Sequence, residues 1–331
     1  MPRVAMTLMT LDSETATMPF ANLLANGNEE KKKRIAISRP LIYDIGWNIM
    51  KRDGTILERK QYLVSEVFCT PQVFSTAYYA EKRPIYLAMI ERGEIEIKTW
   101  KEITEELVRD MERVDYVGAF NSMFDFKKAI PFTELYIQKL YSPDYYEWEK
   151  VQYNLCKNIA ENRTYNKPDR TFDAENFCFR GKEYKMFDIW GMACEHLLNR
   201  VKYKELCLDL GMLTNSGEFF KSSAESSYRY LCEQYDFEEA HTALADAEIE
   251  SAILAKILRR TGIKVGIEYF PFRKLGTTDD FVLNHCRRKR VERAEVVYKA
   301  MEDYIGDEDE LTNYQRHILN RMEALREVME G

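Results

Sequence analysis

The sequence contains no apolar run that approaches the roughly 18 residues of a membrane-spanning helix. Its N-terminus lacks a basic region followed by an apolar core and a small-residue cleavage site, so we expect no secretory signal. The seven cysteines stand singly and form no CxxC pair, which argues against a disulfide framework and against a zinc ribbon. These absences favour reduced thiols and a cytoplasmic location.

The chain also lacks an excess of positive charge. Its formal net charge of −7 is not typical of a protein that coats nucleic acid non-specifically. An acidic total does not exclude a nucleic-acid enzyme, because local basic patches can contact phosphates while a carboxylate cluster adds to the negative sum. With 331 residues, 45% hydrophobic and 31% charged, the chain can bury a sizeable core as one large domain or two modest ones.

The first part of the chain is rich in predicted strands. Residues 4–12 are almost continuously apolar, which indicates a strand buried on both faces. Two β-rich runs follow, at 41–50 and 55–64, and the Asp-Gly step in the KRDG segment between them favours a hairpin.

Helical patterns then alternate with short strands. Residues 99–114 combine a capping box with apolar residues at helical spacing, and a short buried strand is expected over 116–120. The aromatic- and Asn-rich residues 142–185 have weak periodicity and are predicted to be an insertion. We therefore predict an α/β domain over 1–261, with a mixed sheet flanked by helices, and a mainly helical C-terminal extension over 262–331.

Two acids stand at the end of the first predicted strand. Asp12 and Glu14, in the segment LDSETA, are two residues apart, so their side chains leave a strand on the same face. Like charges a few ångströms apart repel each other and cost free energy when they lose their water. A cation between them would remove this cost.

A third acid, Asp125, follows the predicted strand 116–120. It falls near the first turn of the next predicted helix, for which Asn121 is a suitable N-cap. Taken alone, Asp125 has an ordinary explanation, since acids are favoured near helix N-termini.

The fourth acid lies on a helical stripe. Asp246 shares this stripe with Ile249 and Ile253 and therefore faces the sheet, where a carboxylate is expensive unless it is paired or bound to a cation. His241 is five residues earlier. With Thr242 as the N-cap, the histidine falls just outside the helix, where its ring can reach the same site.

Four carboxylates and one histidine fit two-metal phosphodiester hydrolysis. Oxygen ligands suit Mg²⁺ or Mn²⁺. Two ions roughly 4 Å apart clamp the attacking and leaving oxygens and lower the pKa of the attacking water. A histidine with a reference pKa of about 6.5 can accept that water's proton near neutral pH.

The order of these motifs resembles the DEDDh exonucleases, the superfamily of polymerase proofreading subunits, RNase T and oligoribonuclease. The first motif, D-x-E-T, begins at Asp12, the second, N-x-x-x-D, at Asn121, and the third, H-x-x-x-x-D, at His241. The resemblance covers about residues 4–260 and implies a ribonuclease H-like fold, two bound Mg²⁺ or Mn²⁺ ions and a histidine general base. The implied metal ligands and base are Asp12, Glu14, Asp125, Asp246 and His241.

The resemblance also implies that Thr15 and Asn121 contact the substrate. The chain departs from the family at two places: Thr15 is followed by Ala16 and Thr17 without the usual glycine, and Phe120 stands where a histidine is frequent. These positions shape the pocket for the terminal nucleotide, so the departures concern substrate preference more than chemistry.

The expected activity is 3′→5′ release of nucleoside monophosphates from single-stranded ends, with DNA slightly favoured over RNA. Two alternatives stay open: an RNA-trimming enzyme or oligoribonuclease, and a non-catalytic nucleic-acid-binding or partner-binding module on the same fold. The segment 262–331 is also a candidate for docking a protein partner, and no membrane partner is expected.

The basic run RRKRVER, residues 287–293, is predicted to be helical. Arg287, Arg290 and Arg293 approximate one stripe of that helix, and we expect Arg287 and Arg290 to contact the phosphate backbone of a substrate. A charged, solvent-facing helix is the ordinary alternative.

Overall fold

The structure, a computed structural model, describes residues 6–161, 173–286, 288–306 and 311–330, and these form two compact units. Unit 1 takes in the described residues of Met1–Ile189 and Glu239–Ile267, and unit 2 those of Trp190–Glu238 and Glu268–Gly331. This division differs from the expected one, because residues 190–238 belong with the C-terminal segment rather than with the sheet.

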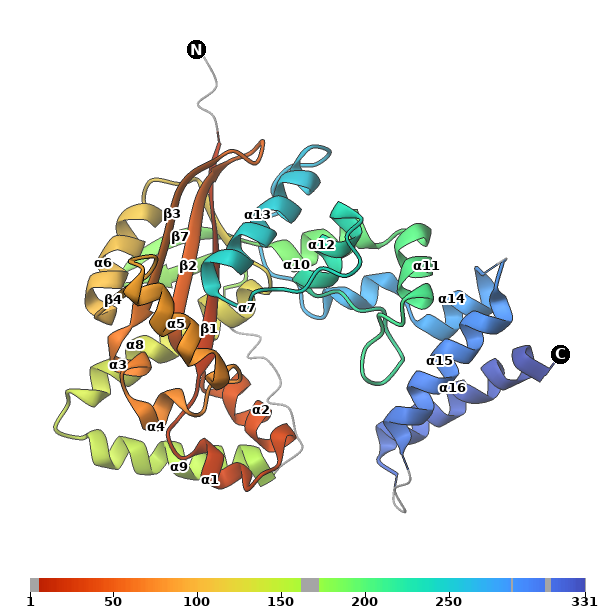
Figure 1. Cartoon of the computed structure of the whole chain (residues 1–331), viewed down its shortest axis with the longest axis horizontal. Helices are drawn as coiled ribbons and strands as arrows, with labels where there is room; N and C mark the ends of the chain where they lie inside the picture. Colours follow the sequence, from red (N-terminus) through yellow and green to blue (C-terminus); the bar gives the residue numbers. More distant parts are fainter. Residues whose placement is uncertain (1–5, 162–172, 287, 307–310, 331) are drawn as a thin grey trace, which may run out of the picture. The chain divides into compact units, whose positions relative to one another are not determined.

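Unit 1 is built on a β-sheet, several strands of which are labelled in Figure 1. The sheet has seven strands in the order β4-β3-β2-β1-β5-β7-β6. Strand β1 is antiparallel to β2 and parallel to β5, and β5 is parallel to β7, so the sheet is mixed. The predicted α/β class is confirmed, and the arrangement fits a ribonuclease H-like fold. The strands are β1 (Thr7–Ala16), β2 (Leu41–Lys51), β3 (Ile56–Val64), β4 (Glu96–Lys98), β5 (Tyr116–Ala119), β6 (Asn176–Phe179) and β7 (Lys182–Asp188).

Helices cover both faces of this sheet. Helix α13 (Ala243–Leu258) packs on one face, where β2 carries Gly46; a Cβ added there would come within 2.7 Å of the Ala243 carbonyl carbon. Helix α6 (Trp100–Met111) packs on the other face, where the indole N–H of Trp47 donates to Asp110 Oδ2 at 2.9 Å. The other helical segments of unit 1 are α1 (Ala21–Ala25), α2 (Glu29–Ser38), α3 (Ser65–Phe68), α4 (Pro71–Phe74), η1 (Ala80–Lys82), α5 (Arg83–Glu91), α7 (Ser122–Phe124), η2 (Asp125–Ala129), α8 (Ile130–Leu140) and α9 (Tyr145–Glu161).

Several local predictions are confirmed. The hairpin of β2 and β3 forms in antiparallel register, and α6 begins with both hydrogen bonds of the predicted Thr99–Glu102 capping box. Strand β1 extends to Ala16, so Asp12 and Glu14 lie within the strand rather than beyond its end. All seven cysteines are free thiols.

Residues 142–185, expected to be an insertion, contribute to the sheet. They contain β6 and most of β7, and β7 pairs directly with β5. The turn between β6 and β7 places Arg180 and Gly181 at positive φ, the backbone that a two-residue hairpin needs. An Arg-Gly step is a weaker hairpin signal than Asn-Gly or Asp-Gly, which explains why the sequence did not indicate these strands.

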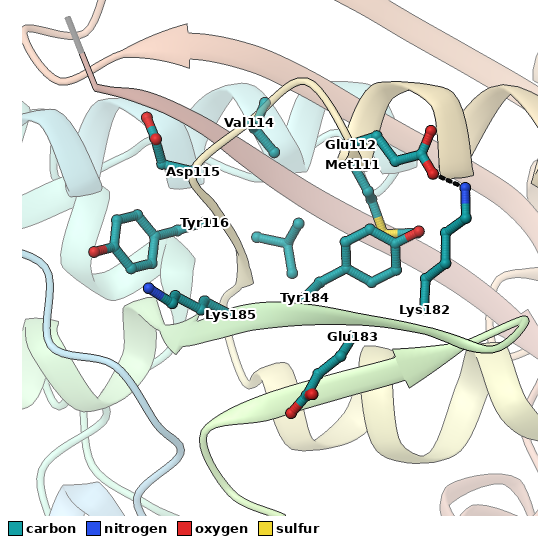
Figure 2. A pocket seen from close by; sticks show the side chains of 10 residues that line it. Met111, Glu112, Val114, Asp115, Tyr116, Lys182, Glu183, Tyr184 and Lys185 are labelled. Carbon is teal, nitrogen blue, oxygen red and sulfur yellow. Dashed lines mark ion pairs between the residues drawn. The ribbon is translucent and has the colours of Figure 1, made fainter. Parts of the chain in front are cut away.

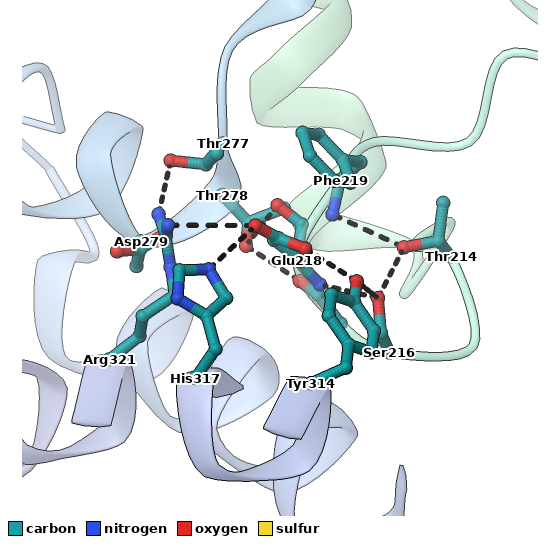
Figure 3. Close-up of polar contacts among 11 residues, drawn as sticks. Thr214, Ser216, Glu218, Phe219, Thr277, Thr278, Asp279, Tyr314, His317 and Arg321 are labelled. Atoms are coloured by element: carbon teal, nitrogen blue, oxygen red, sulfur yellow. Dashed lines mark hydrogen bonds and ion pairs between the residues drawn. The ribbon is translucent and has the colours of Figure 1, made fainter. Parts of the chain in front are cut away.

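Unit 2 is mainly helical in the part of the chain that the structure describes. Its last helix is held by the buried carboxylate of Glu218, which accepts a hydrogen bond from the hydroxyl of Tyr314 at 2.5 Å and lies 3.5 Å from the guanidinium of Arg321 (Figure 3). The helical segments are α10 (Ile189–Ala193), which starts at the unit boundary, η3 (Cys194–Leu198), α11 (Val201–Asp209), α12 (Ala224–Cys232), η4 (Pro271–Leu275), α14 (Thr278–Asn284), α15 (Arg290–Ile305) and α16 (Asn313–Glu330).

Across the described ranges of both units, no helix has the length and apolar character needed to cross a membrane.

Candidate active site

Strand β1 directs two acids toward α13. Asp12 lies opposite Gly46 in the ladder with β2, and Glu14 lies opposite Asp44. Since Gly46 contacts the start of α13, all of these residues face that helix. A bulge between Glu14 and Thr15 interrupts the ladder, and such bulges often redirect side chains beside functional sites.

Asp125 is tied to the same strand from another element. It opens the π-helical turn η2, and the residue is only 2% exposed. The hydroxyl of Ser13 donates to Asp125 Oδ1 at 2.5 Å. Pro131, in the first turn of α8, has no N–H group to donate to the preceding turn. The wider π-helical turn before it is compatible with the loss of this hydrogen bond. Asp125 is thereby fixed next to the strand that carries the first two acids.

Asn121 does not act as the predicted N-cap. Its side chain makes no capping hydrogen bond, and its φ of +76° is left-handed, a conformation that Asn tolerates better than most residues. The N–H groups of Asn121 and Ser122 donate instead to Asp188 Oδ1, at 3.1 and 3.0 Å. Asp188 takes over the capping because β7 ends beside β5.

The third motif brings a histidine to the acids. As predicted, α13 begins after Thr242, and Asp246 is 8% exposed. His241 lies just before the helix, and its Nδ1 is 3.9 Å from Asp246 Oδ2. Ligand atoms of Glu14, His241 and Asp246 all lie within 4.8 Å of one another. These three residues form a cluster that could hold a metal ion.

A neighbouring segment holds the loop that carries His241. The imidazole stacks on the ring of Tyr79, with ring centroids 4.4 Å apart and planes 18° from parallel. The ammonium of Lys82 lies 4.5 Å from the centroid of that same ring and donates to the carbonyl of Ala240 at 2.7 Å. No sequence motif indicated Tyr79 or Lys82, because these contacts join segments about 160 residues apart, which local patterns do not connect.

Two buried acids beside the cluster were missed by the sequence analysis. The Asp44 carboxylate accepts hydrogen bonds from the Gln61 amide, the Tyr86 hydroxyl and the N–H of Ala243, which it caps in place of Thr242. Glu250 is 2% exposed and lies one helical turn after Asp246. Its spacing of four residues from Asp246 was the signal available in the sequence.

Burial raises the pKa of the acids in this region. Asp125 and Asp246 reach a pKa of about 7, in both cases chiefly because they are buried. Burial also raises the pKa of Asp12 well above its usual value, and the nearby Glu250 and Asp125 add to the effect. For Glu14, burial and then Asp246 act in the same direction. The cluster therefore gains free energy by binding either protons or a cation.

No family model, curated protein or solved structure matches the chain. The likeness to the DEDDh exonucleases therefore stays a prediction, drawn from the three motifs. Within the structure those motifs come from β1, from the segment after β5 and from the start of α13, and they reach one region of unit 1.

A separate cavity of about 490 Å³ lies where β5 and β7 begin, at the ends of these strands that are away from the acids (Figure 2). It is lined by the first residues of both strands, and an ion pair between Glu112 and Lys182 lies on its wall. The acids gather beyond the last residues of β5, so this cavity is not part of their site.

The predicted substrate contacts fall in different places. Thr15 is half-buried directly after Glu14. Arg290 belongs to unit 2, where it donates to the Leu283 carbonyl at 2.8 Å, and Arg287 lies outside the described residues. Arg293, the third arginine of the predicted stripe, is 6% exposed and is ion-paired with Glu205 and Asp209 within unit 2.

Proposed function

We propose that this chain is a metal-dependent 3′→5′ exonuclease that releases nucleoside monophosphates from single-stranded nucleic-acid ends. The observation that supports it best is the cluster of Glu14, His241 and Asp246, whose ligand atoms lie within 4.8 Å although two distant segments supply them. The hydrogen bond from Ser13 holds Asp125 next to the same strand, and Asp125 acts on the carboxyl group of Asp12.

The donor atoms suit hard divalent cations, and we propose that two such ions bind. The donor atoms are mainly carboxylate oxygens, which suit Mg²⁺ or Mn²⁺. Asp246 Oδ1 is buried and, among the described residues, has no hydrogen-bond partner, so an acceptor is available where a cation would bind. When bound, such ions neutralise phosphate charge and acidify an attacking water. The residues that would hold them are Asp12, Glu14, Asp125 and Asp246.

His241 is the general base of this proposal. Its side chain is 31% exposed, so water reaches the ring, while the stack on Tyr79 fixes the ring's orientation. Imidazole can take a proton near neutral pH, and a positioned base contributes about 10²- to 10⁴-fold to such reactions.

A single strand is favoured because the terminal nucleotide must leave a partner strand before it can enter a site lined by acids. The departures at Ala16, Thr17 and Phe120 leave the sugar preference to experiment, with DNA slightly favoured. The free thiols agree with action in a reducing compartment such as the cytoplasm.

A gel time course tests this proposal. Single-stranded DNA and RNA of one sequence, labelled at the 5′ end, are incubated with wild type or Asp12→Ala in Mg²⁺, Mn²⁺ or EDTA. We expect a metal-dependent ladder that shortens from the 3′ end and is absent for the variant. Binding without any ladder on either polymer would instead support a non-catalytic module.

A further inference from the structure

Glu250 is a buried acid for which the proposed site gives no role. It lies on α13, one turn after Asp246, and is 2% exposed. Burial raises the pKa of its carboxyl group, and the nearby backbone N–H of Phe120 acts against this rise. Its Oε2 atom is buried and has no hydrogen-bond partner within the described part of the chain. One oxygen of this carboxylate is therefore buried without a hydrogen bond from the described residues, which is costly for a charged group.

The surroundings of Glu250 are acidic. Among the charged neighbours of Asp12, Glu250 raises the pKa of that carboxyl most after burial, ahead of Asp125. Asp125 and Asp246 in turn act on Glu250. Glu250 thus lies close to the acids of the first and second motifs.

Asp44 shows what a structural acid looks like in the same fold. It is as deeply buried as Glu250, but both of its oxygens accept hydrogen bonds, from Gln61 and Tyr86 among others. Hydrogen bonds alone explain why Asp44 is tolerated. They do not explain Glu250, because its Oε2 atom has no hydrogen-bond partner among the described residues, which suggests a ligand from outside the chain.

We propose that Glu250 belongs to the metal site and supplies a fifth carboxylate, which acts with Asp12 and Asp125 to hold the second of the two cations. This inference rests on the proposed function. It assigns Glu14 and Asp246 mainly to the first cation, in agreement with their mutual distance.

The substitution Glu250→Gln separates this role from a structural one. Glutamine has nearly the same shape and keeps one oxygen that can accept a hydrogen bond, whereas the negative charge is lost. The matched control is Glu248→Gln, two residues earlier on α13, because Glu248 is exposed and pairs with Arg59 at 2.5 Å. Both variants remove one charge from the same helix.

The readout is Mn²⁺ binding by the full chain, measured by titration calorimetry and electron paramagnetic resonance, with thermal unfolding in EDTA. We expect two ions on wild type and on Glu248→Gln. For Glu250→Gln we expect the second ion to bind roughly 10- to 100-fold more weakly, and the metal-free protein to melt at a higher temperature. Should Glu250→Gln fail to fold, Glu250→Asp replaces it, with the same expected loss of the second ion.

Two outcomes would overturn the inference, and they differ in what else they affect. If Glu250→Gln binds both ions as wild type does, Glu250 is not part of the site, and the proposed function stands. If wild type binds no Mn²⁺ at all, the proposed function fails together with the inference.

Discussion

The repulsion among the carboxylates of the site can be tested by replacing one of them at a time. Asp12 is close to several other acids, and without a cation its charge opposes folding. We expect Asp12→Ala to abolish cleavage and to raise the melting temperature of the protein in EDTA, because the substitution removes one member of a like-charged group. Calorimetry of both proteins in metal-free buffer measures this. A lowered melting temperature would show that Asp12 stabilises the fold and would contradict the repulsion argument.

The raised pKa values also predict how stability depends on pH. Asp125 and Asp246 have a pKa of about 7 when folded but about 3.9 when unfolded. Between these values the folded state binds more protons than the unfolded state. The contribution of these two groups to the free energy of unfolding is therefore full below about pH 4 and is lost as the pH rises through about 7.

Divalent cations replace those protons, so the stabilisation that they give should grow over the same range. We expect Mg²⁺ to raise the melting temperature more at about pH 8 than at about pH 5. Thermal unfolding at both pH values, with Mg²⁺ and with EDTA, gives the two shifts. Equal shifts in melting temperature at the two pH values would mean that Mg²⁺ binding does not displace protons from these acids.

His241 is itself one of the three residues of the cluster that could hold a metal ion. Its proposed role as general base must therefore be distinguished from a role as metal ligand. If it is the base, His241→Ala should lower turnover by about 10²- to 10⁴-fold and leave the Mn²⁺ affinity unchanged. Single-turnover cleavage and Mn²⁺ titration of the same preparation measure both quantities. Loss of Mn²⁺ affinity would reassign the histidine to the metal.

At the scale of elements, the site depends on how closely α13 approaches the sheet. A Cβ at Gly46 would meet the backbone at the start of that helix. We expect Gly46→Ala to destabilise the protein by about 1–3 kcal/mol and to weaken Mn²⁺ binding, because α13 carries Asp246. Gly262→Ala is the control, since a Cβ there meets nothing within 4 Å. Unchanged Mn²⁺ affinity in Gly46→Ala would show that the position of α13 tolerates a shift.

The sequence predicted elements well where the signal was local. The Asp-Gly turn between β2 and β3 and the capping box of α6 each depend on neighbouring residues, and both are present. The role of Asp188 and the stacking of Tyr79 on His241 depend on contacts between distant segments, which the sequence does not display. The motifs nevertheless indicated four of the acids and His241, because the first motif lies in a strand, the second follows a strand and the third begins a helix.

At the scale of the whole molecule, the chain is divided into two units, and the acidic cluster lies entirely in unit 1. The network around Glu218 lies entirely in unit 2 (Figure 3). We expect Glu218→Ala to destabilise the packing of α16 by about 2–3 kcal/mol, since Tyr314 and Arg321 lose a charged partner, and to leave the Mn²⁺ affinity unchanged. Hydrogen exchange of α16 and Mn²⁺ titration measure the two effects. A weakened Mn²⁺ site would show that the units are energetically coupled.

The path of the chain between the units has a consequence for protein synthesis. The ribosome makes β1 to β7 first and then residues 190–238 of unit 2, and only afterwards α13, which completes unit 1. Until α13 has left the ribosome, Gly46 lacks the helix that packs against it, and neither Asp246 nor His241 is near the other acids. A chain that folds as it is made therefore carries no complete acidic cluster until α13 has been made, while it is still close to the messenger RNA.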